Sequence, residues 1–195
     1  VHMGELDGKV AIITGAGRLR GIGRAAAVSL ARLGADVVVT GTGRDPSSFP
    51  DDEKAINWKD VESVAEQVRA EGRRALTLTV DVTSRDDVQN MIDRTVDEFG
   101  RIDILINNAA FARGVDRVPI LELDEDVFQK VMDIKVTGTF LCTKAAISHM
   151  IEQGEGGKIV NISSTAGKRG SANTLAYNGA NFAIVGMTQS MAQEL

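Results

Sequence analysis

The chain of 195 residues has few of the residues that disulfides and metal sites need. It contains one cysteine, Cys142, and two histidines, His2 and His149. A single cysteine cannot form an internal disulfide, which fits a reducing compartment, and we expect Cys142 to be a small buried residue on a helix. Two histidines argue against a histidine-based metal site, so we expect no bound metal.

The sequence also lacks an excess of basic residues and a long apolar run. It has 22 Lys and Arg against 27 Asp and Glu, which argues against nucleic acid as the main partner. No apolar segment approaches the ~18 residues of a membrane span, and no signal peptide is recognisable. We therefore expect a cytoplasmic protein without a membrane partner. Val1 and His2 before Met3 are interpreted as a cloning remnant, which leaves residues 4–195 as one domain.

Short β-rich segments alternate with longer helical patterns along the chain. This alternation is typical of βαβ units, and strands that are apolar on both faces belong inside a sheet covered by helices on both sides. The sequence therefore predicts a single-domain α/β fold with a doubly wound, Rossmann-type parallel sheet. The expected strands are residues 9–14, 35–40, 75–80, 102–106 and 158–162, and the expected helices are about 21–33, 61–71, 84–99, 125–151 and 175–195.

A glycine-rich loop, residues 14–23 (TGAGRLRGIG), lies between the first expected strand and the first expected helix. Glycine lets the backbone turn tightly and approach a pyrophosphate, and the helix N-terminus offers free N–H groups to phosphate oxygens. In this position the pattern predicts a dinucleotide-binding loop. The candidate cofactor contacts in the loop are Gly15, Arg18, Gly21, Ile22 and Gly23.

The residues after the second expected strand bear on the choice of cofactor. NAD sites usually have a carboxylate there, which accepts hydrogen bonds from the ribose 2′-hydroxyl. This chain instead has Gly41 and Arg44 in that stretch, and its first carboxylate is Asp45. A 2′-phosphate would be attracted by Arg18, Arg20 or Arg44. We therefore expect NADP(H) rather than NAD(H), unless these arginines are solvated surface charges.

Residues 41–60 show no clear periodicity and hold two of the three prolines. Such a stretch is typical of a long loop. It is either a solvated insertion or a flap over the adenosine end of a cofactor.

Three further motifs follow the third, fourth and fifth expected strands. They are Asp81-Val82, residues 107–110 (NNAA), and Ser164 with Tyr177 thirteen residues later. Together with the glycine loop, these motifs resemble the short-chain dehydrogenase/reductase family over nearly the whole chain. The loop departs from the usual Thr-Gly-x-x-x-Gly-x-Gly of the family by two extra residues. The resemblance implies a nicotinamide cofactor with contacts from Asp81, Val82, Asn108 and Ala109.

The resemblance also implies an active site in which two residues are exchanged. The family places its catalytic tyrosine in Tyr-x-x-x-Lys and has an Asn on the preceding helix. Here Asn181 stands four residues after Tyr177, and Lys135 occupies the place of the helix Asn. The usual tyrosine pKa is about 10, and a nearby cation favours the phenolate. We interpret the exchange as a compensated rearrangement in which Lys135 supplies the charge that lowers the pKa of Tyr177. Asn181 then forms neutral hydrogen bonds, while Ser164 holds the substrate oxygen.

Other interpretations of the exchange remain open. In one, Lys135 faces solvent and the enzyme is weak. In another, the site is inactive. The missing cation is otherwise supplied by Lys168 or Arg169, which lie on a loop.

The predicted function is an oxidoreductase that transfers hydride between the nicotinamide cofactor and a small alcohol or carbonyl substrate. The alternative is an inactive nucleotide-binding pseudoenzyme acting as a sensor or scaffold. An epimerase or dehydratase that retains its cofactor is a third possibility.

The resemblance implies a homo-dimer or homo-tetramer formed through the two long helices that carry Lys135 and Tyr177. The last helix reaches Leu195 without a cap or a breaker. We therefore expect that the natural polypeptide continues beyond this residue.

Overall fold

The computed structural model describes residues 4–195, and the expected cloning remnant at Val1 and His2 lies outside the described residues. Five strands form one sheet in the order β3-β2-β1-β4-β5, and every pairing is parallel. This sheet confirms the predicted doubly wound α/β fold. The strands, each within two residues of its expected position, are β1 (Val10–Ile13), β2 (Asp36–Gly41), β3 (Ala75–Thr79), β4 (Ile104–Asn107) and β5 (Lys158–Asn161).

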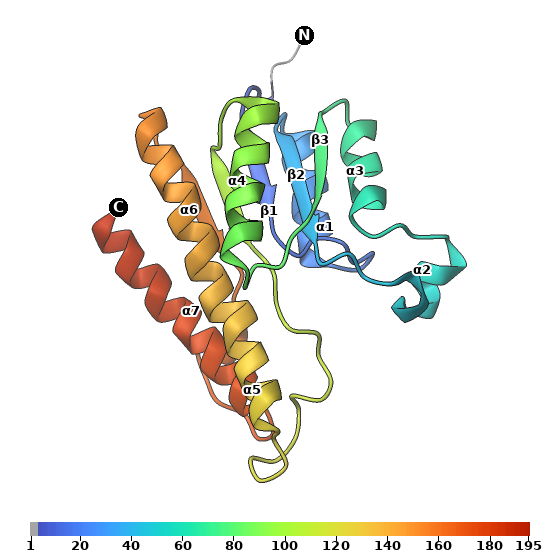
Figure 1. Cartoon of the computed structure of the whole chain (residues 1–195), viewed down its shortest axis with the longest axis vertical. Coiled ribbons are helices and arrows are strands. Elements are labelled where there is room, and N and C mark those ends of the chain that lie inside the picture. Colours follow the sequence, from blue (N-terminus) through green and yellow to red (C-terminus); the bar gives the residue numbers. More distant parts are fainter. Residues whose placement is uncertain (1–3) are drawn as a thin grey trace.

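Helices cover both faces of the sheet, with α4 on the near side in Figure 1. On one face, α4 and α6 share a core with the strands, and on the other face α1 and α3 do so. The helices are α1 (Ile22–Arg32), α3 (Val61–Ala70), α4 (Arg85–Phe99) and α6 (Gly138–Gln153).

The central strand β1 shows how the two layers form. Val10 and Ile12 lie in the core beneath α4 and α6, whereas Ala11 and Ile13 lie in the core beneath α1 and α3. Successive side chains of a strand point to opposite faces, so a strand that is apolar throughout can fill both cores. None of the four is more than 3% exposed.

The ends of α4 are set by local signals in the sequence. Ser84 Oγ accepts a hydrogen bond of 3.2 Å from the Asp87 N–H at the start of the helix. Gly100 ends the helix with a φ of 76°, a conformation that costs glycine little.

The expected helix 125–151 is interrupted. A π-helical turn, η2 (Asp133–Thr137), separates α5 (Glu125–Met132) from α6. The prediction of one regular helix was therefore wrong at this point, because hydrophobic periodicity does not reveal a single extra residue in one turn. Such π turns occur frequently at functional sites, and this one contains Lys135.

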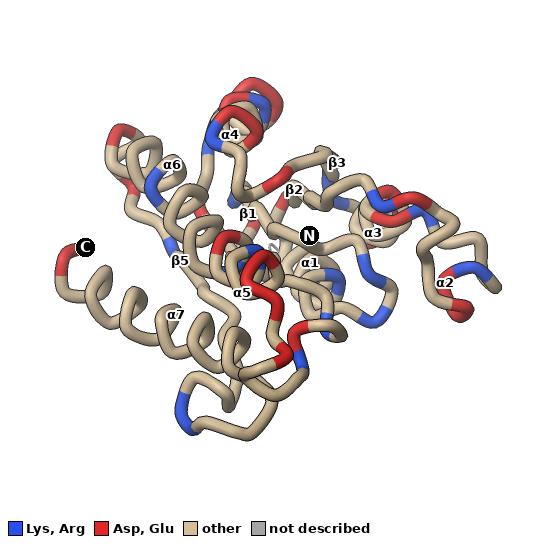
Figure 2. The backbone as a smooth tube through the Cα atoms, turned by 60° about the horizontal axis from the view of Figure 1, so that its bottom comes forward, with Lys and Arg blue, Asp and Glu red and all other residues tan. Residues whose placement is uncertain are grey.

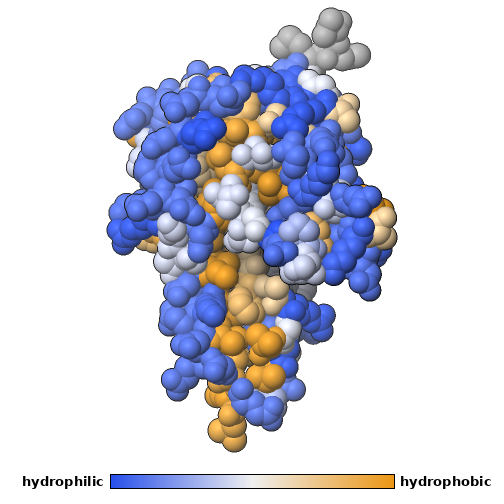
Figure 3. Space-filling view, turned by 45° about the vertical axis from the view of Figure 1, so that its right-hand side comes forward, coloured by the Kyte–Doolittle hydropathy of each residue, from blue (hydrophilic) through white to orange (hydrophobic). Residues whose placement is uncertain are grey.

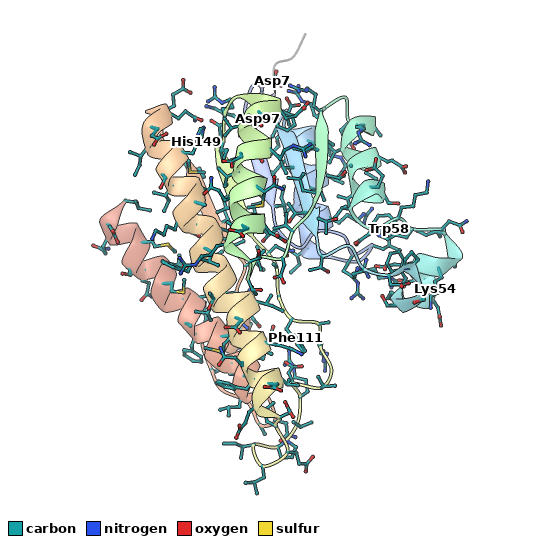
Figure 4. The ribbon with its side chains drawn as sticks, in the orientation of Figure 1. Asp7, Lys54, Trp58, Asp97, Phe111 and His149 are labelled. Atoms are coloured by element: carbon teal, nitrogen blue, oxygen red, sulfur yellow. The ribbon has the colours of Figure 1, made fainter. Side chains whose placement is uncertain are left out.

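The expected loop 41–60 contains two short elements. They are a 3-10 turn, η1 (Pro46–Ser48), and the helix α2 (Asp51–Ala55). The prediction of an irregular loop was wrong in this respect, because five residues are too few to show a helical period. Acidic residues fill the first turn of α2, where the helix dipole favours negative charge. Lys54 on α2 and Trp58 just after it are labelled in Figure 4.

The helix α7 (Leu175–Glu194) packs against α5. Val131 of α5 meets Ala176 and Ala180 of α7 in a small apolar cluster. Figure 1 shows α5, α6 and α7 grouped on the side of the sheet away from α3. Among residues 4–195, no helix combines the length and the apolar character needed to cross a membrane.

Candidate active site

The carboxyl ends of β1 and β4 are joined by Asn108, one of the expected cofactor contacts. Its side-chain amide donates hydrogen bonds of 2.9 Å to the carbonyls of Thr14 and Gly15. In return, Thr14 Oγ1 accepts hydrogen bonds of 3.1 Å from the N–H groups of Asn108 and Ala109. These bonds hold the start of the glycine loop against the segment that follows β4.

The glycine loop leaves no room for a Cβ at three of its positions, and at Gly17 the Cβ would lie 1.7 Å from Asp60 Oδ1. Gly15 has a φ of 63°, and a Cβ there would lie 2.7 Å from Ala109 Cα. A Cβ on Gly23 would lie 2.6 Å from Asn108 Nδ2. Gly21 precedes α1 with extended backbone and without a side-chain cap, so the N–H groups of the first helical turn remain available to an anion. The loop therefore fits the pyrophosphate of a dinucleotide.

A cavity of about 660 Å³ opens beside this loop, over the ends of β2 and β3. It contains most of the residues expected to contact the adenosine half of a cofactor. Its lining includes Gly15, Arg18, Gly41, Arg44, Asp60, Asp81, Val82 and Ala109.

A second cavity of about 260 Å³ lies between the glycine loop and α7. The expected active-site residues Lys135, Tyr177 and Asn181 line it together with Ser163. Gly21, Ile22 and Asn108 also lie in its wall.

The two cavities form one groove, because Gly15, Arg18, Ala110 and Phe111 line both of them. Phe111, labelled in Figure 4, lies beyond the carboxyl ends of the strands. Figure 3 shows apolar side chains gathered in a strip down the middle of one face, with hydrophilic side chains on either side. A groove at this end of a doubly wound sheet is where such folds bind their ligands.

Comparison with known proteins agrees with this geometry. Residues 9–195 match the family described as short chain dehydrogenase. The chain belongs to the short-chain dehydrogenase family. Its relatives include the short chain dehydrogenase/reductase astE of Aspergillus oryzae, which is 40% identical over 97% of this chain and 66% of its own length. The 2-dehydro-3-deoxy-D-gluconate 5-dehydrogenase of Escherichia coli is 37% identical over 97% of this chain and 67% of its own length.

Solved structures of the family have the same fold. The carveol dehydrogenase of Mycobacterium avium in complex with NAD superimposes with a TM-score of 0.86 at 32% identity. The match covers 98% of this chain and 67% of the carveol dehydrogenase. This chain thus spans about two thirds of the length of the relatives that it matches.

Lys135, at the family's Asn position, is almost completely buried. Its side chain comes from the π turn η2 and donates a hydrogen bond to the carbonyl of Ile162, just after β5. Only 6% of Lys135 is exposed, so the interpretation of a solvent-facing lysine is wrong. Burial lowers the pKa of its ammonium from 10.5 to about 8, because desolvation penalises the charged form.

Asn181, at the family's Lys position, is also buried and is held by protein groups. Its amide donates a hydrogen bond of 2.9 Å to the carbonyl of Tyr177, and its Oδ1 accepts one of 3.3 Å from Ser163 Oγ. The two exchanged residues thus line the same cavity. Lys168 and Arg169, the other candidate cations, are exposed and do not line it.

Ser164, the expected substrate-orienting residue, is half-buried at the start of the 3-10 turn η3 (Thr165–Gly167). Its hydroxyl accepts a hydrogen bond of 3.2 Å from the Ala166 N–H. The neighbouring Ser163, rather than Ser164, belongs to the cavity wall. The sequence did not single out Ser163.

The arginines expected to attract a 2′-phosphate are already paired with carboxylates. Arg44 donates hydrogen bonds of 2.9 Å to Glu53 and 2.9 Å to Asp60, and a longer one of 3.3 Å to the carbonyl of Gly17. Arg18 lies 3.3 Å from the other oxygen of Glu53. The exposed Arg20 pairs with Asp52 at 2.7 Å. Each of the three arginines thus has a carboxylate partner in the structure.

Sequence reasoning missed two charged residues of this family member's site. Asp60 lines the adenosine cavity although it lies well beyond the end of β2 in sequence. Arg117 covers the ring of Tyr177, with its Cζ 3.8 Å from the ring centre. Neither residue belongs to a motif that marks it, because both lie in irregular segments. Among residues 4–195, no group of histidine, cysteine or acidic side chains has an arrangement that could hold a metal ion.

Proposed function

We propose that this chain is an NAD(H)-dependent dehydrogenase that interconverts an alcohol and a carbonyl. One observation carries the proposal. A single groove contains a phosphate-binding loop and, at its other end, a cavity lined by Tyr177 and by the buried Lys135, which has no carboxylate partner among residues 4–195. A bound nicotinamide cofactor would supply the hydride acceptor or donor. The groove residues would bind the cofactor and transfer the proton to or from the substrate.

Tyr177 is the residue that exchanges a proton with the substrate. In the direction of carbonyl reduction its hydroxyl donates a proton to the substrate oxygen, and in alcohol oxidation its phenolate accepts that proton. Ser164 holds the substrate oxygen by a hydrogen bond. In this arrangement Ser164 turns its hydroxyl from the backbone of η3 towards the substrate when the substrate binds.

Lys135 supplies the positive charge that the family usually has at position 181. Three observations support this role: Lys135 is buried, it lines the cavity of Tyr177, and its carbonyl partner Ile162 neutralises none of its charge. With the pKa near 8, most of the lysine is still protonated at neutral pH. Asn181 forms the neutral hydrogen bonds that hold the start of α7 against Ser163.

Asp60 favours NAD(H) over NADP(H). A Cβ on Gly17 would lie 1.7 Å from Asp60 Oδ1, which places this carboxylate against the glycine loop. Asp60 holds this place with a φ of 53°, a value that L-residues adopt rarely and usually at functional positions. The Asp60 carboxylate, which already pairs with Arg44, would accept a hydrogen bond from a ribose 2′-hydroxyl. The NAD in the carveol dehydrogenase structure agrees with this choice.

The activity is tested by substrate-dependent formation of NADH with a panel of secondary alcohols. We expect Lys135→Met to lower kcat/KM by about 10²-fold or more, while NADH still binds. The pair Lys135→Asn with Asn181→Lys should retain more activity than either single change. Full activity in Lys135→Met would refute the role of the lysine. NADH binding without turnover of any substrate would favour the inactive nucleotide-binding protein.

The cofactor is tested by comparing NADH and NADPH binding in the wild-type chain and in Asp60→Ser. The preference for NADH should fall by at least about tenfold, or ~1.4 kcal/mol. Asp45→Ser is the matched control, because Asp45 lies in the same segment but is exposed at the start of η1. Tighter binding of NADPH than of NADH by the wild-type chain would contradict the proposal.

We also propose that two or four copies associate through α6 and α7. The helix α7 carries no Lys, Arg, Asp or Glu before Glu194, as Figure 2 shows. Phe140 on α6 and Phe182 on α7 are 48% and 46% exposed. Large exposed apolar side chains, here on α6 and on the nearly uncharged α7, are typical of an interface. Sedimentation of the chain at several concentrations tests this, and a monomer throughout would exclude it.

A further inference from the structure

Arg117 lies in the loop between β4 and α5, and its guanidinium lies over the ring of Tyr177. The distance of 3.8 Å from Arg117 Cζ to the ring centre is that of direct stacking. The Arg117 side chain is 23% exposed, so little water reaches the contact. Nothing in the family's active-site motif assigns a residue to this position.

A short turn holds Arg117 in place. Its N–H donates a hydrogen bond of 3.0 Å to the carbonyl of Gly114. Asp116 accepts a hydrogen bond of 3.1 Å from the Gly114 N–H, and its other oxygen lies 3.0 Å from Arg117 Nε. The Asp116 side chain is only 3% exposed. The turn and the buried carboxylate therefore direct the guanidinium towards Tyr177.

We propose that Arg117 is a positioning residue that orients the ring of Tyr177 and favours its phenolate form. The inference rests on the proposed function, in which Tyr177 exchanges a proton with the substrate. A cation is attracted to the face of a neutral phenol, and it is attracted more strongly when the negative charge of a phenolate spreads into the ring. In alcohol oxidation the phenolate takes the hydroxyl proton while the hydride passes to NAD⁺. Reduction reverses both transfers.

Three charged residues line the cavity that contains Tyr177. Lys135 comes from η2, Arg18 from the glycine loop and Asp116 from the turn that carries Arg117. Lys135 loses its charge in the alkaline range, because burial lowers its pKa to about 8. Arg117 keeps its charge throughout, because a guanidinium is not deprotonated in proteins. At alkaline pH Arg117 therefore stays positively charged over the ring, paired through its Nε with Asp116.

The test uses the fact that Tyr177 is the single tyrosine of the chain. Its ionisation can be followed directly by the near-ultraviolet absorbance of the phenolate in the cofactor-free protein. We expect Arg117→Met to move the midpoint of this titration to higher pH. Arg117→Lys, which keeps a cation over the ring, should stay near the wild-type midpoint. Arg113→Met is the matched control, because Arg113 is an exposed residue of the same loop.

An unchanged midpoint in Arg117→Met would overturn the proposal, as would a shift of the same size in Arg117→Lys. If Arg117→Met does not fold, as judged by circular dichroism, Arg117→Gln takes its place with the same expected shift. In active protein, the acidic limb of the kcat/KM profile for alcohol oxidation should move with the titration midpoint. The titration does not require turnover, so failure of the proposed dehydrogenase activity would be distinguished from failure of this inference.

Discussion

Replacing Lys135 by methionine removes a charge that the fold buries and keeps an unbranched side chain. Burial lowers the pKa of this lysine from 10.5 to about 8, which corresponds to about 3 kcal/mol at ~1.4 kcal/mol per pH unit. The change also removes the hydrogen bond to the carbonyl of Ile162, which costs about 1 kcal/mol. At pH 7 we therefore expect the Met variant to be more stable than the wild type by about 2 kcal/mol.

The pH dependence of this effect has a definite sign. The folded protein releases the Lys135 proton near pH 8, whereas the unfolded chain keeps it up to about 10.5. Between these values the unfolded state binds more protons, so the free energy of unfolding of the wild type rises with pH. The advantage of the Met variant should shrink over this range and vanish above it. Above this range, the two proteins should differ in stability only by the hydrogen bond that the Met variant lacks.

Urea unfolding of the cofactor-free protein at pH 7, 8, 9 and 10, followed by circular dichroism, measures the effect. Lys144→Met is the control, because Lys144 lies on α6 and is exposed. If the Met variant at position 135 is less stable at pH 7, or if its stability changes with pH as the wild type's does, Lys135 is not a desolvated ammonium. Lys135 would then not supply the charge proposed for the cavity of Tyr177.

Three further experiments test other parts of the structure. Gly17→Ala should weaken NADH binding at least about tenfold, because the new Cβ would lie 1.7 Å from Asp60 Oδ1; quenching of the single tryptophan measures it. Cys142 should resist alkylation at pH 8 in the folded chain and react after unfolding, because burial raises the pKa of its thiol to about 12; counting labelled thiols checks this. Asp103→Asn should lower the free energy of unfolding by about 2 kcal/mol at pH 7, as measured by urea unfolding. Burial raises the pKa of Asp103, but hydrogen bonds from Arg101, the Val10 N–H and Lys9 outweigh it and lower the pKa overall. The difference should therefore narrow as the pH falls through this lowered pKa.

The sheet and the phosphate-binding loop could be predicted because their signals are local. The strands β1, β2 and β4 are short apolar runs that fill two cores, as Val10 and Ala11 do on opposite faces of β1. The glycines at 15 and 23 are required by contacts with Ala109 and Asn108, and the motif records that requirement. Such features need no knowledge of the distant parts of the chain.

The cofactor end of the groove could not be predicted in the same way. Asp60 reaches the glycine loop only because α2 and the turn after it fold back over Gly17, where Trp58 donates a hydrogen bond of 2.7 Å to the Gly17 carbonyl. The pairing of Arg44 with Glu53 and Asp60 likewise depends on that path. The sequence shows only that these arginines are positively charged. Their pairing with carboxylates depends on how distant segments of the chain fold together.

The reaction end was predicted in part. The sequence identified Tyr177, Lys135 and Asn181, and the structure places all three in the wall of one cavity. It did not identify Arg117, because stacking on a ring from an irregular loop leaves no periodic or motif signal. The roles of these residues remain predictions.

The π turn η2 has a consequence for how the protein tolerates insertions and deletions. An α-helix rotates by about 100° per residue, and the turn accommodates one residue more than a regular helix would. It therefore sets the angular phase between α5, whose Val131 faces α7, and α6, whose Cys142 and Ala146 face the sheet. Deleting a single residue from 133–137 would turn one of these apolar stripes away from its partner, although every remaining side chain would be unchanged. The packing of α5 and α6 therefore depends on the number of residues in η2.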